Sequence, residues 1–317
     1  MDDIRRIKSV ILELSSKCNL NCLYCNNDIL PDRTSMPYER AVEYFYKMPD
    51  HVIKYVFHFS GESCLNRSFV KIVRFLSDNN RFMSVCTNGM VNSRVYVDAL
   101  ANGLNELIFA IDGFNNATHE AHKIGSSLAL IKKNLEEAIR SKPSSTTVGV
   151  QYLVMRSNEN EIDDMRKYLM NIGADFFYLK SISLNLGASE ALENKRIESA
   201  NKVLPLNQKY SRYICNENSI ALKSPVSECN LVYEPVVTAN GDIAKCCVDF
   251  EKLINIGNLQ NYSFFSDLWN SEGYVRVRKM ATKKQLESCK RCNFTTSGVI
   301  YEIGEANGRT GEYIADR

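Results

Sequence analysis

The sequence predicts an α/β fold, in which a partial (β/α)6 barrel precedes a small C-terminal domain made of a β-hairpin and a helix. Six short apolar segments, rich in β-branched and aromatic residues, alternate with helical patterns along the first 182 residues. Such alternation implies parallel strands joined by helical crossovers, with functional groups at the C-terminal strand ends. The alternation then stops, and VVTANGDIAKCC indicates two strands turned at Asn240 and Gly241.

The elements follow in chain order. The six expected strands are 10–14, 55–59, 82–86, 107–111, 148–154 and 176–180. Pro37 begins a helix over 38–48, as proline does in a first turn. Apolar residues at helical spacing from Leu128 to Ala138 predict another helix.

A third helix is expected to end at Gly173, with Asn158 and Glu161 as its capping box. Near the end of the chain, one helix over about 264–280 contains the only tryptophan, Trp269. A helical piece is also expected near 188–203. The predicted organisation is a barrel core at 1–182, a connecting region at 183–228, a cluster-binding domain at 229–294 and a loose, Gly-rich tail at 295–317.

Composition excludes several classes of protein. The 317 residues carry a formal net charge of +2, which provides no basic field for coating nucleic acid. No stretch approaches the ~18 apolar residues of a membrane span, and the N-terminus is not a signal peptide. The chain has 11 cysteines, an odd number, so a disulfide framework fits poorly. A cytoplasmic protein with metal-binding cysteines is expected, with no nucleic-acid or membrane partner.

Three of the cysteines, Cys18, Cys22 and Cys25, directly follow the first expected strand. A zinc ion would need a fourth ligand, whereas a [4Fe–4S] cluster held by three cysteines keeps one iron open for another molecule. This CxxxCxxC motif resembles that of the radical S-adenosylmethionine (SAM) enzymes, in which SAM binds the open iron. A zinc knuckle and a chance occurrence are the alternatives.

Further motifs follow the later strands. Ser60-Gly61-Glu62 resembles the family's glycine–glutamate motif, whose backbone and carboxylate receive the SAM ammonium, although an ordinary turn has the same pattern. Thr87-Asn88-Gly89 follows the third strand, and Asp112-Gly113 with Lys123 looks like the family's strand-four segment. Ala110 and Lys123 stand where the family often has serine and arginine. The resemblance implies that SAM contacts Tyr24, Ser60, Gly61, Glu62, Thr87, Asn88, Asp112 and Lys123.

A second group of cysteines lies near the end of the chain. Its order is Cys229, then Gly241 and Cys246 with four residues between them, then Cys289-Lys-Arg-Cys292. This order, with Gly257-Asn258 and the Trp269 helix, resembles the SPASM domain or its shortened Twitch form. The resemblance implies that the four cysteines hold one auxiliary [4Fe–4S] cluster, because no cysteine follows Cys292. A structural zinc site with the same ligands is the alternative.

Cys246 and Cys247 are adjacent, and neighbours on a strand point to opposite faces. The glycine spacing selects Cys246 as the ligand, although Cys247 stays open for that role. Cys247 is otherwise a core cysteine or a hydrogen-donating thiol, and Cys64 is the second donor candidate. Cys86 and Cys215 are expected as buried apolar cysteines.

The resemblance implies the reaction class. An electron donor such as flavodoxin or ferredoxin reduces the first cluster, and SAM gives a 5′-deoxyadenosyl radical that abstracts a substrate hydrogen. Dehydrogenation is favoured, and epimerisation through a donor thiol is the alternative.

For the substrate, the resemblance leaves two classes. A small sugar- or aminocyclitol-like molecule is favoured, because 17 residues before Cys18 are too few for a leader-binding module. Maturation of a ribosomal peptide by Cα oxidation, epimerisation or crosslinking is the runner-up. Arg156 and Lys180, at strand ends, could hold a substrate carboxylate or phosphate, or be surface charges. His58 lies on the strand face opposite Tyr55 and Phe57, so it either points into the barrel or, as is commoner, is a satisfied core histidine.

Overall fold

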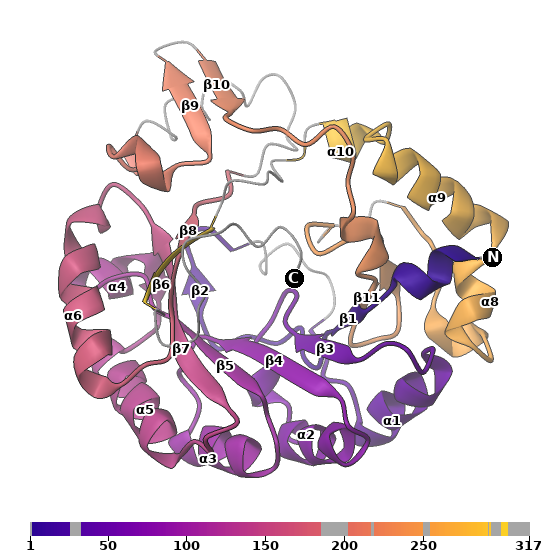
Figure 1. Cartoon of the computed structure of the whole chain (residues 1–317), viewed down its shortest axis with the longest axis horizontal. Coiled ribbons are helices and arrows are strands. Elements are labelled where there is room, and N and C mark those ends of the chain that lie inside the picture. Colours follow the sequence, from indigo (N-terminus) through magenta and orange to yellow (C-terminus); the bar gives the residue numbers. More distant parts are fainter. Residues whose placement is uncertain are drawn as a thin grey trace.

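A curved nine-stranded sheet forms the centre of the computed structural model, with helices around its outside (Figure 1). The structure describes residues 2–25, 33–184, 202–216, 219–249, 254–290, 292 and 299–303. Seven neighbouring strands of this part are parallel, in the order β11 (Val236–Val237), β1 (Ser9–Leu12), β3 (Lys54–Phe57), β4 (Phe82–Thr87), β5 (Glu106–Ala110), β7 (Thr147–Val154) and β8 (Phe177–Ser181). The edge strands β12 (Ile243–Ala244) and β13 (Val299–Ile303) are antiparallel to their neighbours. The sheet is open, and the expected α/β partial barrel with its six strands is confirmed.

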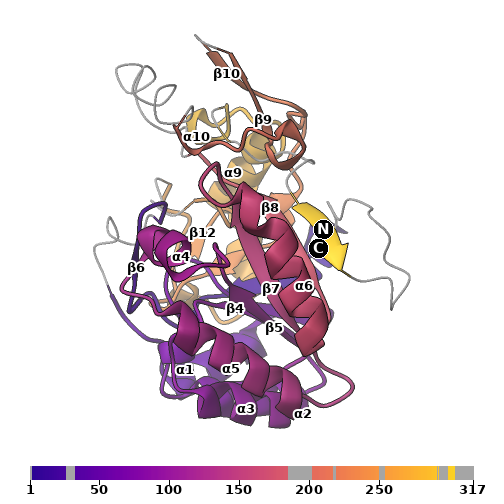
Figure 2. The same ribbon diagram turned by 90° about the vertical axis from the view of Figure 1, so that its left-hand side faces the viewer.

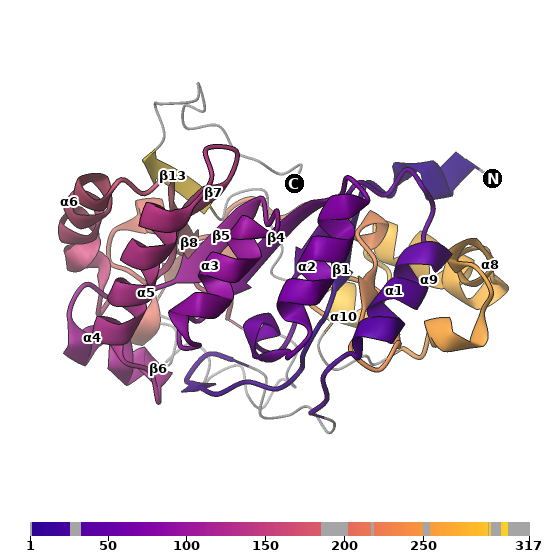
Figure 3. The ribbon, with the colours of Figure 1, turned by 90° about the horizontal axis from the view of Figure 1, so that it is seen from below.

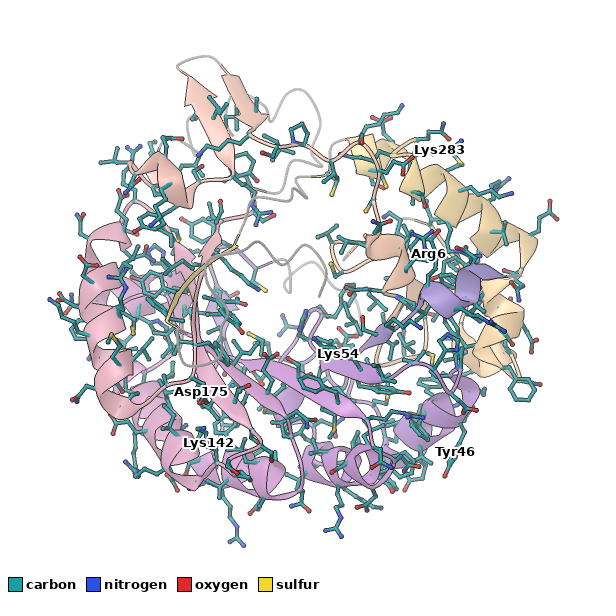
Figure 4. The ribbon with its side chains drawn as sticks, in the orientation of Figure 1. Arg6, Tyr46, Lys54, Lys142, Asp175 and Lys283 are labelled. Carbon is teal, nitrogen blue, oxygen red and sulfur yellow. The ribbon has the colours of Figure 1, made fainter. Side chains whose placement is uncertain are left out.

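Amphipathic helices cover the convex face of this sheet, as Figure 3 shows from below. They are α1 (Tyr38–Lys47), α2 (Phe69–Asp78), α3 (Ser93–Ala101), α5 (Leu128–Ser141) and α6 (Ile162–Ile172). The apolar stripe of α5 is fully buried, and Tyr55 and Phe57 of β3 enter the same core. Because side chains alternate along a strand, the residues between them face the concave side of the sheet. Lys54 is labelled on this inner side in Figure 4, whereas Tyr46 of α1 points outward.

Shorter elements complete the described structure. They are the 3-10 helices η1 (Asp2–Arg6), η3 (Ser63–Leu65), η4 (Glu159–Glu161), η6 (Gln208–Tyr210), η7 (Leu231–Tyr233) and η8 (Leu259–Asn261), the strands β2 (Asn21–Cys22), β6 (Lys123–Ile124), β9 (Tyr213–Asn216) and β10 (Ser219–Leu222), and the helices α4 (Asn116–His122), α8 (Phe265–Trp269), α9 (Glu272–Thr282) and α10 (Glu287–Lys290). Figure 2 shows the β9–β10 hairpin standing apart from the main sheet.

The C-terminal hairpin joins the core sheet. β11 pairs in parallel with β1, with Ile11 opposite Val236, and β12 returns antiparallel to β11. Ile11, Val236 and Ala244 form a small apolar cluster on this junction. The pairing satisfies the free edge of β1, which would otherwise expose a row of backbone groups. Consequently, the cysteines at the end of the chain are attached to the strand that precedes the first cysteine group.

Four local predictions need correction. The single helix over 264–280 is two helices, α8 and α9, because the Ser271 hydroxyl accepts the Tyr274 N–H and starts a new helix. The connecting region contains the β9–β10 hairpin, while most of the expected helix at 188–203 lies outside the described residues. The expected loose tail includes β13, which pairs with β8.

The fourth correction concerns the capping box. Asn158 and Glu161 do not cap each other, because their side chains bind more distant segments. Glu161 accepts the backbone N–H groups of Phe114 and Asn115 at 2.6 and 3.2 Å, and Asn158 donates to the Asp112 carbonyl at 3.0 Å. Tertiary partners therefore replace the expected local pair.

Candidate functional site

The first cysteine group lies in the loop after β1. The short strand β2 pairs with β6, which places Cys22 opposite Lys123, and the Leu23 N–H donates to the His122 carbonyl at 3.0 Å. Cys18 and Cys22 are half-buried, whereas Cys25 is exposed. These contacts fix the loop to the segment after β5.

The three thiols lie close enough to influence each other electrostatically. Burial raises the pKa of Cys22 to about 11, Lys123 opposes that rise, and Cys25 and Cys18 add to it. Burial also raises the pKa of Cys18, and the charges of Glu62 and Cys25 raise it as well. In the described residues, no three Cys, His, Asp or Glu side chains converge on the position of a single ion. An all-thiol donor set in one loop fits an iron–sulfur cluster, because thiolates are its usual ligands.

Gly61 permits a close backbone contact with this loop. A Cβ atom at Gly61 would lie 2.3 Å from the Ser15 carbonyl oxygen and 2.7 Å from that of Lys17. The next residue, Glu62, donates its N–H to the Lys17 carbonyl at 2.8 Å. The Ser60-Gly61-Glu62 turn therefore packs directly on the residues that precede Cys18.

The Glu62 carboxylate organises the turn after β4. It accepts the N–H groups of Cys64 and Asn88 at 3.0 and 2.7 Å, and the Thr87 hydroxyl at 3.0 Å. Burial raises the pKa of Glu62, and these hydrogen bonds oppose that rise. The Asn88 amide reaches the cysteine loop, at 2.8 Å from Asn19 Oδ1 and 3.7 Å from Cys18 Sγ.

Asp112 and Lys123 form a buried ion pair of 3.2 Å at the neighbouring strand end. Asp112 also accepts the Leu153 N–H at 2.8 Å. Burial would lower the pKa of Lys123, but Asp112 and the Cys22 thiol outweigh burial and raise it. Lys123 therefore presents a positive charge beside the cysteine loop.

The remaining member of this set, Tyr24, is exposed, with its ring 6.0 Å from that of His122. The motifs that follow β1, β3, β4 and β5 thus lie on one edge of the sheet, as their positions in the sequence indicate. Glu62, Thr87, Asn88 and Cys18 are joined by direct contacts. Sequence reasoning found each of these residues from the strand that precedes it.

Sequence reasoning missed Glu13, a buried glutamate at the end of β1. Its Oε1 accepts the N–H of Ser60 at 3.2 Å and the Ser60 hydroxyl, and its Oε2 accepts the Ala239 N–H at 3.0 Å. Glu13 is only 3% exposed. One carboxylate therefore connects the turn before Glu62 with the C-terminal hairpin. The signal was an acidic residue within the apolar run SVILEL.

The C-terminal cysteines are gathered from separate segments. The Cys229 N–H donates to the Thr282 carbonyl at 2.9 Å, at the end of α9, and the Cys292 N–H donates to the Cys289 carbonyl at 3.2 Å. Burial raises the pKa of Cys229 and of Cys289, and the Cys292 thiol adds to both rises. These thiols are therefore close neighbours although 60 residues separate Cys229 from Cys289.

Cys246 and Cys247 occupy a turn, not a strand. β12 ends at Ala244, and the Asp249 N–H closes the turn on the Cys246 carbonyl at 3.1 Å. The expected alternation of neighbouring side chains on a strand therefore does not apply to this pair. Cys246 is 7% exposed, and burial raises its pKa well above the usual range.

Cys247 is half-buried and packs on the cluster at the β1–β11 junction, together with Val56 and Phe59. Burial raises the pKa of Cys247 to about 12, and Glu234, Cys229 and Cys292 add to the rise. Cys247 thus lies beside other thiols of the group and also reaches the concave side of the sheet, whereas the thiol that acts on Cys246 is that of its neighbour Cys247.

The other candidate residues lie in different parts of the molecule. Cys64 lies in the core of the convex side, away from the concave face. Cys86 of β4 and Lys180 of β8 are half-buried, and their charges influence each other. Arg156 is exposed, and its Nε donates to the Leu204 carbonyl at 3.3 Å. Cys215 lies on β9, half-buried and outside both cysteine groups.

His58 is accessible to solvent just beyond β3, so the expectation of a core histidine was wrong. Although the ring is open to solvent, the protein around it limits its hydration, and this effect together with the Lys180 and Lys54 charges lowers its pKa to about 4. Burial lowers the pKa of Lys180, and the Arg212 guanidinium adds to that effect. His58 is therefore neutral near pH 7, within electrostatic reach of Lys180.

Comparison with known families identifies the two domains that carry the cysteine groups. The model of the radical SAM superfamily matches residues 12–169, which include Cys18, Cys22 and Cys25. The chain belongs to the radical SAM superfamily. A second model, the SPASM iron–sulfur cluster-binding domain, matches residues 229–293. This radical SAM enzyme thus binds SAM and a [4Fe–4S] cluster, and its SPASM domain implies auxiliary iron–sulfur chemistry.

Two curated relatives span most of the chain. A probable GTP 3′,8-cyclase of Methanocaldococcus jannaschii is 23% identical over 296 residues, which cover 86% of this chain and 98% of the relative. The tungsten-containing aldehyde ferredoxin oxidoreductase cofactor-modifying protein of Pyrococcus furiosus is 24% identical over 322 residues, covering 90% of this chain and 87% of the relative.

Solved structures share the fold. BtrN in complex with AdoMet and 2-DOIA has a TM-score of 0.56 at 17% identity, covering 92% of this chain and 94% of BtrN. His-tagged anSMEcpe with bound AdoMet has a TM-score of 0.62 at 16% identity, with coverage of 92% and 85%. SuiB of Streptococcus suis, bound to its precursor peptide SuiA, has a TM-score of 0.62 at 13% identity, with coverage of 90% and 71%.

Two further properties concern the helices and the cysteines of this radical SAM enzyme. Among the described helices, none has both the length and the apolar character needed to cross a bilayer. None of the 11 cysteines, all of them in the described residues, forms a disulfide. The thiols of both groups are therefore available as cluster ligands.

Proposed function

We propose that this enzyme removes a hydrogen atom from a small sugar- or aminocyclitol-like substrate and completes a two-electron oxidation. The observation that carries the proposal is the parallel pairing of β11 with β1. Through this pairing, the C-terminal cysteines and the first cysteine loop are anchored on adjacent strands of one sheet. Cys247 reaches the concave side at the same junction. An electron acceptor beside the substrate site suits an oxidation.

The ligand assignments are part of this proposal. Cys18, Cys22 and Cys25 hold the first cluster, and Cys229, Cys246, Cys289 and Cys292 hold one auxiliary cluster. Tyr24, Ser60, Gly61, Glu62, Thr87, Asn88, Asp112 and Lys123 surround SAM. When bound, SAM and its cluster would supply a 5′-deoxyadenosyl radical to take the substrate hydrogen, and the auxiliary cluster would take the second electron while the substrate releases a proton to water.

The chain's own groups on the concave face hold the substrate. Lys180 supplies a cation and His58 a neutral imidazole that both donates and accepts hydrogen bonds. These groups match a hydroxylated molecule with one polar or anionic substituent. Arg156 has a weaker claim, because it is exposed and its Nε is bound to the Leu204 carbonyl.

The electron donor is a small low-potential protein such as flavodoxin or ferredoxin, and we place the reaction in the reducing cytoplasm. Cys25 is the exposed member of the first group, so its loop is the natural side for the donor to approach. Low-potential clusters and unoxidised thiols both require such a compartment.

Epimerisation is the second candidate, and the position of Cys247 favours it. In that reaction the substrate radical takes a hydrogen atom from the Cys247 thiol, so a new C–H bond forms and a thiyl radical remains. One electron from the reductant and one proton from water then restore the thiol. The substrate keeps its oxidation state, which separates this reaction from dehydrogenation.

The test is anaerobic turnover in D2O with SAM, reductant and a panel of aminocyclitols, hexosamines and short peptides. Dehydrogenation predicts a product about two mass units lighter, without deuterium at the reacting carbon, and full activity in Cys247→Ala. Cys215→Ala, on the hairpin outside both groups, is the matched control. Unchanged oxidation state with one deuterium incorporated, lost in Cys247→Ala, would establish epimerisation instead. Modification of peptides alone would support the peptide maturase.

A further inference from the structure

A buried ion pair closes the turn that carries Cys246 and Cys247. The Lys245 ammonium and the Asp249 carboxylate bind each other, and their side chains are 4% and 3% exposed. The Lys245 N–H also donates to Asp249 Oδ2 at 3.4 Å, and the Asp249 N–H donates to the Cys246 carbonyl at 3.1 Å. Removing two charges from water is costly, so this pair is not an ordinary surface contact.

The two charges act on the same auxiliary thiols with opposite sign. Burial raises the pKa of Cys289, Lys245 opposes that rise, and Asp249 adds to it. For Cys246, burial again raises the pKa, while Lys245 opposes and Asp249 adds. Both members of the pair are therefore within electrostatic reach of Cys246 and Cys289.

We propose that Lys245 and Asp249 set the reduction potential of the auxiliary cluster. Reduction adds a negative charge, which the buried ammonium of Lys245 stabilises and the carboxylate of Asp249 opposes. Charges in a poorly hydrated site interact more strongly than charges on the surface. Net charge and hydrogen bonds near the sulfurs are among the factors that set the potential of such clusters. The inference rests on the proposed auxiliary cluster, and it makes the pair a tuning device for an electron acceptor.

Lys290 provides a matched control. It lies inside the Cys289-Lys-Arg-Cys292 motif, close in sequence to two ligands, but its side chain is 59% exposed and paired with Glu287 at 3.2 Å. Solvent and salt screen an exposed charge. Lys290 and Lys245 therefore carry the same charge near the same motif and differ in burial.

The experiment is an EPR-monitored redox titration of the full-length, reconstituted chain in which Cys18, Cys22 and Cys25 are replaced by alanine. This background leaves the auxiliary cluster as the source of the signal, and wild-type holoenzyme serves as a second background. Lys245→Met should lower the midpoint potential of the cluster by about 59 mV for one electron. At a fixed applied potential, the ratio of reduced to oxidised cluster then falls about tenfold. Asp249→Asn should raise the potential, and Lys290→Met should leave it unchanged.

Three outcomes would overturn the proposal: no shift in either single variant with four irons retained, shifts in the same direction, or loss of the cluster in both. Lys245→Arg keeps the charge, so it should keep the potential even if Lys245→Met loads poorly. The titration is independent of the substrate reaction. If turnover gives no oxidised product while the potentials shift as stated, the proposed function fails and this inference stands.

Discussion

The two cysteine groups are built in different ways. The first group occupies eight consecutive residues of one loop, and the ends of two neighbouring strands, β3 and β4, support it through Gly61, Glu62 and Asn88. The second group collects cysteines from three places: Cys229 just before η7, whose N–H bonds to the end of α9, the turn after β12, and the segment of α10 and Cys292. Each group has a buried lysine–aspartate pair beside it, Lys123 with Asp112 and Lys245 with Asp249.

The difference shows in what holds each group. Residues of the N-terminal helix η1 support the second group, since the Arg6 guanidinium lies 3.5 Å from the centre of the Tyr233 ring. Arg278 stacks at 3.6 Å on Trp269 and contacts Asp3 at 3.3 Å. The first group therefore depends on local contacts at the strand ends, whereas the second depends on contacts between the two ends of the chain.

The largest expected effect comes from removing the first group. Replacing Cys18, Cys22 and Cys25 by alanine should reduce the iron content from about eight to about four per chain and abolish SAM cleavage, because only the first cluster binds SAM. Iron analysis and detection of 5′-deoxyadenosine check both points. Cys215→Ala should match wild type. Retention of eight irons in the triple variant would contradict this assignment.

Substitution of the two adjacent cysteines in the second group should have different effects on the iron content. Cys246→Ala should lose about four irons and keep the SAM-binding cluster, whereas Cys247→Ala should keep both clusters. The reason is the glycine spacing that selects Cys246, together with the position of Cys247 on the concave side. Iron loss in Cys247→Ala alone would reverse the ligand assignment and remove Cys247 as a hydrogen donor.

Glu62→Gln should weaken SAM binding about tenfold without loss of iron, because a charged acceptor is replaced by a neutral one. Equilibrium binding of SAM to the reconstituted protein measures the change. Glu106→Gln is the matched control, since Glu106 is another buried glutamate, at the start of β5, that accepts the Ser84 hydroxyl at 2.6 Å. Glu106→Gln should lower stability and leave SAM affinity near that of wild type. Equal losses of affinity in both variants would make Glu62 a structural residue.

The smallest expected effect contrasts glycines of the two regions. Gly61→Ala should reduce the free energy of unfolding by about 1–3 kcal/mol, because its Cβ would overlap the backbone of residues 15–17. Gly273→Ala, in α9, meets no atom within 4 Å and should be neutral or stabilise by up to about 1 kcal/mol. Chemical denaturation measures both. A Gly61→Ala protein as stable as wild type would show that the close approach is not required.

Features encoded by local spacing were predictable from the sequence. Short sequence patterns encode the six strands, the first cysteine loop and the motifs after each strand. The structure places the loop and the motifs at one edge of the sheet. The pairing of β11 with β1 was not predictable, because Val236 and Ile11 are separated by most of the chain. Glu13, Lys245 and Asp249 were missed for the same reason, since their partners or their burial depend on tertiary contacts.

The central claim is that the first cysteine group holds a cluster with three cysteines, which leaves one iron open for SAM, and that the second group holds a cluster with four cysteines, which leaves no iron open. The most direct measurement is Mössbauer spectroscopy, with metal analysis, of wild-type protein reconstituted with 57Fe, before and after addition of SAM. The account predicts two [4Fe–4S] clusters per chain, with SAM altering the spectrum of one and leaving the other unchanged. Zinc in the second site, or a response of both clusters to SAM, would contradict it.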